Sequence, residues 1–382
     1  MSFNLIRNSR VFFTTNLETD GSVKTSGFLP ANTREIQVLD GFSFSQNTTQ
    51  DTVTLNEAGA VPARGQRSFN TALEPVDFSM STYMRPADGG TNITCEESVL
   101  WNAMFATDAI GGTAPAWSEA TDKATLVATN SQTHQLQRFG LIIVVDGVTY
   151  TIDNCVLDTA TIDFGLDAIA MVAWAGKGSK LNQISGVTAT AAVAGVVTLA
   201  NGLAGTAKGK NTEAPFIANK LSTVTIDDGV NGSGNNTYTL ALTGGSLTIA
   251  NNVTYLMPAN LGVVNRPATY FTGTRAISGS LNCYLRTGAT FSAGLLANML
   301  IGSTTDVSPA FEINIAIGGS ANATKVEFEM PAAVLTIPSV TAEQVVSTTI
   351  NFTAQGSAGT GNAFDIGSAN ELTVRYYTTN AA

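Results

Sequence analysis

Residues Leu141–Ile152 read LIIVVDGVTYTI, two runs of mostly β-branched residues around an Asp-Gly pair. Asp-Gly favours the tight turn of a two-residue β-hairpin, because both residues tolerate a positive φ. A similar pattern occurs later, where INIAI (Ile313–Ile317) and KVEFEM (Lys325–Met330) flank a Gly-Gly loop. The sequence therefore predicts a β-hairpin at two places, and this suggests a search for a larger repeat.

Strands that match each other precede and follow the two hairpins. Val76–Arg85 reads VDFSMSTYMR and Ile277–Arg286 reads ISGSLNCYLR; both alternate polar and apolar residues and both end in Tyr-apolar-Arg. After the hairpins, Val172–Trp174 with Gly178 aligns with Ile350–Phe352 with Gly356. Because alternation is the strand period, each of these segments is predicted to be a β-strand.

A short helix is predicted between the first strand and the hairpin in both copies. Ser98–Phe105 reads SVLWNAMF, and Gly294–Ile301 reads GLLANMLI. The alignment places Leu100 on Leu296 and Asn102 on Asn298. The first helix has apolar residues at helical spacing (Val99, Leu100, Ala103 and Met104), so one face should pack on a sheet.

Thr94 and Glu97, which precede the first predicted helix, have the spacing of a capping box. We therefore expect the Thr94 side chain to cap the start of this helix. The order strand, helix, hairpin, closing strand occurs twice, which predicts an internal duplication.

The duplication divides the chain into two units. The first covers residues 1–181, the second covers residues 212–382, and residues 182–211, rich in Gly, Ala, Thr and Val, read as a linker. Residues 107–137 have no clear counterpart in the second unit and are predicted to be an exposed loop insertion. The predicted fold is mainly β, with two tandem sandwiches or small barrels, each with one flanking helix and a long hairpin.

Composition favours protein–protein contact. Charged residues make up only 13% of the 382 residues, about half the usual share, and Ser, Thr, Asn and Gly are abundant. Strand edges with so little charge are suited to pairing with neighbouring molecules. The net charge is −10, which disfavours a tight grip on nucleic acid but allows DNA to pass without sticking.

Residues that bear on location are few. Cys95, Cys155 and Cys283 are an odd number without metal-binding spacing, as expected in a reducing cytoplasm. Met1–Arg10 has no apolar core of a signal peptide, and Thr188–Ala204 is too weakly apolar to span a bilayer. We therefore expect no membrane association.

A search for catalytic, cofactor or metal sites gives none. The single histidine, His134, lies in the insertion, and no G-x-S-x-G nucleophile motif is present. Asp163 and Asp167 lie near each other in sequence without accompanying metal ligands, and Asp227-Asp228-Gly229 reads as a turn. We expect each of these residues to be structural.

Two glycine-rich segments are also interpreted as structural. Gly205–Thr212 (GTAKGKNT) is one residue too short between its glycines for a P-loop and has Asn211 where Ser or Thr is needed. Gly229–Asn236 is expected to be a hairpin loop. Without basic residues around them, the larger aromatics are expected in the core or at interfaces, namely Phe12, Phe13, Trp101, Trp117, Trp174 and Phe352.

Several of these segments resemble tail tube proteins of tailed bacteriophages, specifically the duplicated type found in long non-contractile tails. The resemblance rests on the start NSRVFFTT (Asn8–Thr15), the strands ending YMR (Tyr83–Arg85) and YLR (Tyr284–Arg286), and NKLSTVTI (Asn219–Ile226). It covers most of the chain apart from the linker and the insertion.

The resemblance implies a structural virion protein that assembles in the host cytoplasm into stacked rings. Family rings contain six tube domains, so a duplicated chain implies a trimer with pseudo-sixfold symmetry. The implied partners are the tape-measure protein in the lumen, DNA in transit without specific binding, and tail terminator and tip proteins. The resemblance implies no enzymatic activity, no cofactor and no residue-level binding site.

Two other interpretations remain open at this point. The chain could be another virion component on a related fold, such as a terminator, sheath-related or decoration protein. It could instead be a carbohydrate-binding adhesin made of tandem β-sandwiches, although an adhesin normally carries a secretion signal.

Overall fold

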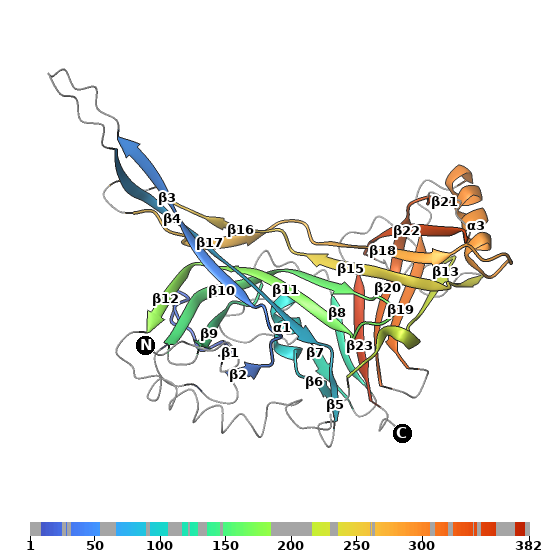
Figure 1. Cartoon of the computed structure of the whole chain (residues 1–382), viewed down its shortest axis with the longest axis horizontal. Coiled ribbons are helices and arrows are strands. Elements are labelled where there is room, and N and C mark those ends of the chain that lie inside the picture. Colours follow the sequence, from blue (N-terminus) through green and yellow to red (C-terminus); the bar gives the residue numbers. More distant parts are fainter. Residues whose placement is uncertain are drawn as a thin grey trace.

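The computed structural model of the chain describes residues 9–24, 28, 32–53, 66–88, 92–105, 117–120, 123–128, 136–145, 148–184, 216–229, 236–259, 261, 264–305, 310–319, 324–338, 340–341, 345–356 and 371–378. These residues form an elongated, mainly β molecule, as the sequence predicts (Figure 1). The described helices are α1 (Ser98–Phe105), α3 (Ser292–Thr305) and the short 3₁₀ turn η2 (Asn219–Leu221). None of them combines the length and apolarity that a bilayer crossing requires.

Two antiparallel sheets in the first half share the long strand β10. The first sheet has the order β2-β1-β9-β10-β12. Its strands are β1 (Ser9–Thr14), β2 (Thr33–Ile36), β9 (Phe139–Val145), β10 (Val148–Asp163) and β12 (Lys180–Ile184). The second sheet has the order β3-β4-β11-β10. Its other strands are β3 (Ser43–Val53), β4 (Arg67–Tyr83) and β11 (Met171–Gly178).

The second half has the same arrangement around β20. One sheet runs β14-β13-β19-β20-β23, and the other runs β15-β18-β22-β20 with β21 also on β22. The strands are β13 (Thr223–Asp227), β14 (Thr237–Thr239), β15 (Leu242–Ala250), β18 (Ala276–Tyr284), β19 (Phe311–Gly318), β20 (Lys325–Leu335), β21 (Val340–Thr341), β22 (Ser347–Ala354) and β23 (Leu372–Tyr377).

The two halves are joined into one continuous strand network. β10 pairs with β15, and β23 pairs with β8 (Ala124–Ala128), which also pairs with β7 (Trp117–Glu119). Two small ladders stand apart, β5 (Pro86–Asp88) with β6 (Ile93–Cys95), and β16 (Val253–Leu256) with β17 (Thr269–Thr272). In Figure 1 the β3–β4 hairpin projects from one end, and α3 lies at the other end.

The predicted hairpins are confirmed. Val145 pairs with Val148, so two residues connect β9 and β10; these residues, Asp146 and Gly147, lie outside the described part of the chain. β19 and β20 form the second hairpin. β13 and β14 pair across the segment after Gly229, as expected for a hairpin loop there.

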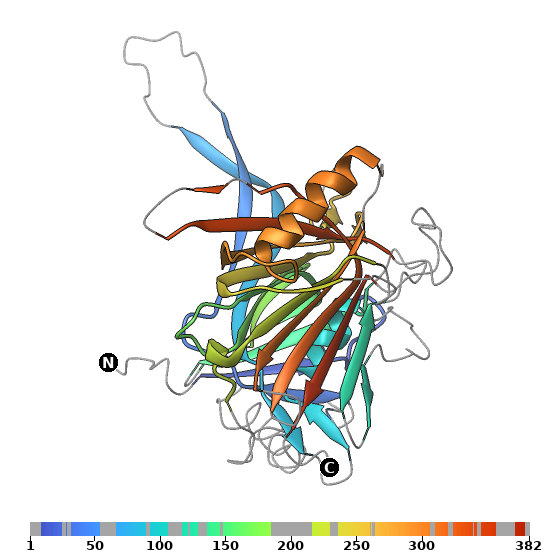
Figure 2. The ribbon, with the colours of Figure 1, turned by 90° about the vertical axis from the view of Figure 1, so that its right-hand side faces the viewer.

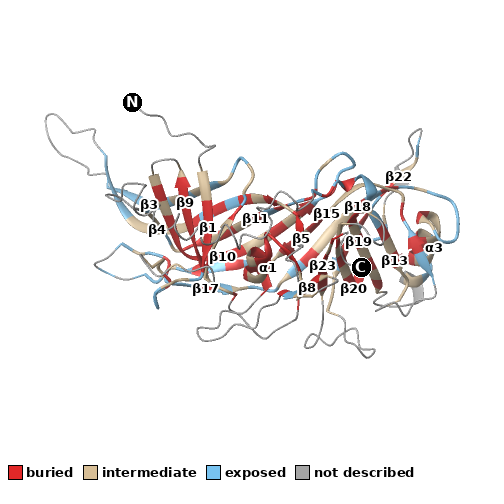
Figure 3. Ribbon diagram, turned by 90° about the horizontal axis from the view of Figure 1, so that it is seen from below, coloured by how far each residue is buried: buried red, intermediate tan, exposed pale blue. Residues whose placement is uncertain are grey.

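The main hydrophobic cluster runs through both halves (Figure 3). At its centre, the rings of Trp101 in α1 and Trp174 in β11 meet edge to face at 4.9 Å. The Trp174 indole donates a 2.9 Å hydrogen bond to the Thr82 hydroxyl, so its polar atom is satisfied. All six aromatics assigned to core or interface positions are buried, namely Phe12, Phe13, Trp101, Trp117, Trp174 and Phe352.

Helix α1 is buried on more than one face, and the predicted capping box is wrong. Thr94 lies in β6 and donates a hydrogen bond to the Glu119 carboxylate. The Glu97 side chain points into the core, where it accepts a hydrogen bond from Tyr376. Long-range partners from outside the helix therefore take both side chains that the local pattern assigned to its N-terminus.

The prediction that residues 107–137 form an exposed loop is also wrong for the residues described. β7 and β8 form a hairpin within this segment, and β8 extends the sheet of the second half through β23. Trp117, Leu126 and Ala128 are buried. The residues ATLVA of β8 have the strand alternation, but the surrounding Ala, Thr and Ser content hid that short pattern.

The segment assigned as a linker, residues 182–211, begins inside strand β12, which extends to Ile184. The remainder of that segment lies outside the described residues. His134 and Gly205–Thr212 also lie outside them, so their predicted structural roles stay predictions.

Candidate assembly interface

The joint between the halves is an antiparallel ladder between β10 and β15. Ile162 pairs with Leu247, and Asp163 pairs with Ser246. Beyond the ladder, Phe164 and Gly245 exchange both backbone hydrogen bonds, at 3.0 and 3.2 Å. The second sheet of the first half therefore continues without interruption into the second sheet of the second half.

Helix α1 fills the space beneath this joint. The Trp101 indole donates a 3.0 Å hydrogen bond to the Tyr376 hydroxyl in β23. The Met104 carbonyl accepts a 3.0 Å hydrogen bond from the Asn251 side chain. The guanidinium of Arg275 lies 5.4 Å from the centre of the Phe105 ring. A helix of the first half is thus also held by residues of the second half.

A buried carboxyl group belongs to this joint. Tyr376 donates a 2.5 Å hydrogen bond to Glu97 Oε1, and both residues are fully buried. Burial raises the pKa of Glu97 to about 8. Burial also raises the pKa of Tyr376, and the nearby Glu97 carboxylate adds to this. At neutral pH the pair is therefore mainly uncharged, which suits its apolar surroundings.

Charged neighbours of Glu97 are held in pairs or hydrogen bonds. Arg85 lies 3.7 Å from Glu96, and the Arg34 guanidinium donates a 2.9 Å hydrogen bond to the Ser98 hydroxyl. Burial lowers the pKa of Arg34 and raises that of the Cys95 thiol. A thiol in this state is a poor nucleophile, so the cluster is suited to structure and not to covalent chemistry.

The second sheets of the two halves form one joined sheet through β10 and β15, and the strands β3 and β21 lie at its two ends. Within the described part of the chain, each of these end strands has one side without a partner strand. Among the described strands, β3 pairs with β4 alone. At the other end, β21 pairs with β22 alone, and Ile337, between β20 and β21, is 47% exposed. Exposed backbone donors and acceptors along such edges can accept another strand.

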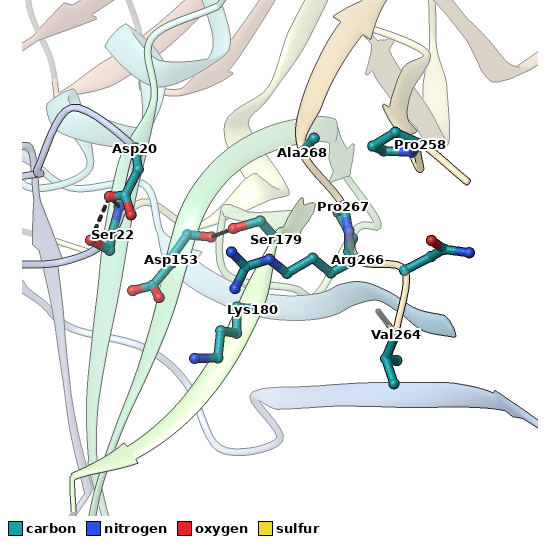
Figure 4. Close-up of a pocket in the computed structure, with 11 residues that line it drawn as sticks. Asp20, Ser22, Asp153, Ser179, Lys180, Pro258, Val264, Arg266, Pro267 and Ala268 are labelled. Carbon is teal, nitrogen blue, oxygen red and sulfur yellow. Dashed lines mark hydrogen bonds between the residues drawn. The ribbon is translucent and has the colours of Figure 1, made fainter. Parts of the chain in front are cut away.

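A groove of about 680 Å³ lies between the first half and the segment before β17. Figure 4 shows Arg266 reaching toward Lys180 and Asp153 from that segment. The Asp153 carboxylate accepts hydrogen bonds from the Val23 amide (3.0 Å) and the Asn182 amide (2.6 Å), and burial raises its pKa. Because both Asp153 oxygens already have protein partners, this carboxylate is positioned as a structural group.

The acidic residues singled out in the sequence do not converge on a site. Asp163 is exposed at the end of β10, and Asp167 lies 4.0 Å from Lys220 on the surface. Asp227 accepts hydrogen bonds from the Gly229 amide and the Thr237 hydroxyl, as expected of a turn residue. The described residues contain no group of three or more candidate metal ligands.

The three cysteines are buried and free of disulfides. Burial raises the pKa of Cys155, and that of Cys283 to about 11. None of the three is thereby activated as a nucleophile.

Sequence reasoning missed the Glu97–Tyr376 pair and the two strand edges. The pair joins residues far apart in the chain, and no local pattern indicates it. Which strands lie at an edge depends on the order of the strands in the sheet, and that order is set by pairing between the two halves.

Comparisons with known proteins agree with the resemblance. The profile of the family described as phage tail tube protein matches residues 87–354. The tail tube protein pb6 of Escherichia phage T5 is 32% identical over 365 residues, which cover 93% of this chain and 73% of pb6.

Proposed function

The chain belongs to the phage tail tube protein family, and we propose that three copies join edge to edge into a ring of six similar units. Its role as a structural component of the virion tail follows from family membership. The finer description below concerns how copies join, and the internal joint between β10 and β15 is the observation that carries it.

A duplication with matching strand register supports the proposal. In the first hairpin Leu141 pairs with Ile152, and after a bulge Phe139 pairs with Cys155. In the second hairpin the corresponding pairs are Ile313 with Met330 and, again after a bulge, Phe311 with Ala333. A bulge at the same place in both hairpins is a specific feature, because bulges fix the local twist of a strand.

Side-chain details at the same register positions agree as well. The hydroxyl groups of Ser43 and Ser79 are 2.8 Å apart across β3 and β4, and those of Ser246 and Ser280 are 3.1 Å apart across β15 and β18. These two hydrogen bonds occupy equivalent positions when Tyr83 is placed on Tyr284.

A glycine–aromatic pair occurs once in each half, with the partners exchanged. The ring of Phe78 covers Gly176, and the ring of Phe352 covers Gly279. This register corrects the alignment of the closing strands by two residues. The counterpart of Phe352 is Gly176, not Trp174, because a sequence alignment of two short strands favours matching aromatics over matching pairs.

The free edges correspond to the two sides of the internal joint. β3 is the counterpart of β15. The pair Val340–Thr348 is the counterpart of Ile162–Val172, so β21 continues the role of β10. Applying the internal register to the edges places Val340 of one copy opposite Phe44 of the next, and Thr341 opposite Ser43.

Repetition of the same joint closes a ring. Each chain contributes one internal joint and two complementary edges, a head-to-tail arrangement that gives a closed ring when the rotation closes. Three copies supply six units, the number implied by the resemblance. The units in this proposal are residues 1–181 and 212–382.

The remaining parts of the proposed role concern the lumen. A stack of such rings would enclose a tape-measure protein during assembly and later conduct DNA, and terminator and tip proteins would bind its ends. The net charge of −10 supports passage of DNA without binding. We propose no catalytic activity and no cofactor, with assembly in the host cytoplasm.

A cysteine pair tests the proposed edge contact. In the internal joint, Asp163 and Ser246 lie opposite each other next to the hydrogen-bonded pair Phe164–Gly245. They therefore form a non-hydrogen-bonded pair, the type in which the two Cα atoms lie closer together. The double variant Ser43→Cys with Thr341→Cys should therefore form disulfides between chains on mild oxidation. The expected product is a closed covalent trimer, identified by its mass on a non-reducing gel and by negative-stain microscopy.

The matched control is Ser43→Cys with Val340→Cys. A shift of one residue moves the second cysteine to the other face of the sheet, so this pair should not cross-link. The native cysteines are buried and should not form disulfides under mild oxidation. Tubes that form without cross-linking of the first pair, or that cross-link the control equally well, would contradict the proposed register, and a closed hexamer would contradict the trimer.

A further inference from the structure

Helix α3 presents an apolar face away from its own half. Ala297 is exposed, and the side chains of Leu300 and Ile301 are 49% and 65% exposed. Their spacing places all three on one side of the helix. Leu295 and Met299, on another face, are buried in the second half. Figures 1 and 2 show α3 on the outside of the molecule, whereas α1 is enclosed.

The exposed face of α3 matches the face that α1 uses at the internal joint. The alignment of Leu100 with Leu296 places three joint residues of α1 on the three exposed residues of α3. The correspondences are Trp101 with Ala297, Met104 with Leu300, and Phe105 with Ile301. In α1 these three residues contact the second half through Phe328, Asn251 and Arg275.

A receiving face for such a helix exists on the first half. In the second half, Phe328 contacts Trp101 of α1, and Leu247 and Leu372 belong to the same hydrophobic core; all three are at most 1% exposed. Their register counterparts in the first half are Phe44, Tyr150 and Leu181, which are only half-buried. The rings of Phe44 and Tyr150 are 5.3 Å apart and form one apolar surface.

We infer that α3 of one copy docks on the receiving face (Phe44, Tyr150 and Leu181) of the next copy, as α1 docks on the second half within a chain. The inference rests on the proposed ring, because the edge contact between β21 and β3 brings these two surfaces together. It explains in one step why one face of α3 is exposed and why the receiving face is only half-buried. The occupant of the receiving face is thus a second copy of this chain.

The geometry of the internal joint also predicts a charge next to Ile301. Arg275 lies over Phe105 at the internal joint. When Tyr83 is aligned with Tyr284, Glu74 aligns with Arg275. Glu74 is a half-buried residue of β4. Glu74 accepts a hydrogen bond from the Thr49 hydroxyl at 3.1 Å. Ile301 of one copy should therefore lie near the Glu74 carboxylate of the next.

Two substitutions at one exposed position test this contact. Ile301→Arg and Ile301→Glu remove the same apolar side chain and introduce opposite charges. We expect Ile301→Glu to raise the protein concentration needed for ring formation at least about tenfold over Ile301→Arg, because it repels Glu74 at every ring contact. Sedimentation velocity over a concentration series at low salt measures this difference.

A charge reversal completes the experiment. With Glu74→Lys, the order should invert, so that Ile301→Glu assembles more readily than Ile301→Arg. The same two charges at Leu221, which is 68% exposed on η2, control for net charge and should differ little. Circular dichroism of each variant checks that the monomer is folded.

The outcomes separate this inference from the proposed function. If rings form and the Ser43–Thr341 cysteine pair cross-links, but both Ile301 variants assemble equally, then helix docking is wrong and the edge contact stands. If the two variants differ but Glu74→Lys does not invert them, then α3 does not lie against Glu74 and the docking is also overturned. Failure of the unmodified chain to form rings would refute the proposed function itself.

Discussion

The substitution Glu97→Gln is expected to remove a pH dependence of stability that arises at the joint between the halves. Glu97 is fully buried, and burial raises its pKa from 4.5 to about 8. The folded protein therefore holds a proton that the unfolded chain releases between these pH values. The stability contributed by this group is complete below pH 4.5 and is lost as the pH rises through about 8.

The size of the effect follows from this interval. The pKa of Glu97 rises from 4.5 in the unfolded chain to about 8 in the folded protein. At about 1.4 kcal/mol per pH unit, the free energy of unfolding falls by about 5 kcal/mol over this range. Between pH 5.5 and 8.5, a range above the isoelectric point of 4.6, the expected part is about 3 kcal/mol. A glutamine keeps an oxygen that can accept the hydrogen bond from Tyr376 and has no proton to lose.

The measurement is urea unfolding of the unassembled protein, followed by tryptophan fluorescence at several pH values. Glu97→Gln should be more stable than the unmodified chain at pH 8.5, and the advantage should shrink by about 3 kcal/mol on going to pH 5.5. Asp153, whose pKa is also raised by burial, contributes equally to both proteins and cancels in the difference.

The exposed substitution Leu221→Gln, which changes no titratable group, serves as a control and should leave the pH dependence unchanged. Parallel stability curves for Glu97→Gln and the unmodified chain would refute the reasoning, because they would mean that Glu97 is ionised in the folded protein at neutral pH.

Two further substitutions test the fold. Gly279→Ala should destabilise the chain by about 1–3 kcal/mol in thermal or urea unfolding. A Cβ at this position would lie 2.5 Å from Phe352 Cζ and 2.1 Å from the Ser246 carbonyl oxygen. Unchanged stability would show that the strands are not packed this closely. Leu126→Ala, in the insertion, should cost about 2–5 kcal/mol by urea unfolding, since Leu126 is fully buried against β23. Val127→Ala, on the opposite face of β8, should cost less than about 1 kcal/mol, and equal losses would contradict the observed burial.

Local patterns predicted the elements of this protein well. The runs around Asp146-Gly147 specify a hairpin because β-branched residues and a two-residue turn leave few alternatives. Residues Val76–Tyr83 lie in β4 and Ser98–Phe105 forms α1, as their periodicities predict. The core positions of Trp101 and Trp174 also follow from local pattern, because large aromatics without basic neighbours are rarely left in solvent.

Features that depend on distant partners were predicted poorly. Thr94 and Glu97 have the spacing of a capping box, yet Thr94 bonds to Glu119 and Glu97 accepts a hydrogen bond from Tyr376. A buried carboxyl group needs a hydrogen-bond partner, and here that partner lies far away in the sequence. The strand in the insertion was missed because its sheet partner, β23, lies at the other end of the chain.

The sequence by itself determined that the chain is mainly β, because strand alternation and turn residues are local properties, and it also carried the resemblance to tail tube proteins. Only the tertiary structure decided how the units join. The pairing of β10 with β15, the enclosure of α1 by Tyr376 and the exposure of α3 result from contacts between residues remote in sequence. Strand edges and helix faces look alike in sequence whether they are covered or not, since only the arrangement of the other strands decides which of them remain accessible.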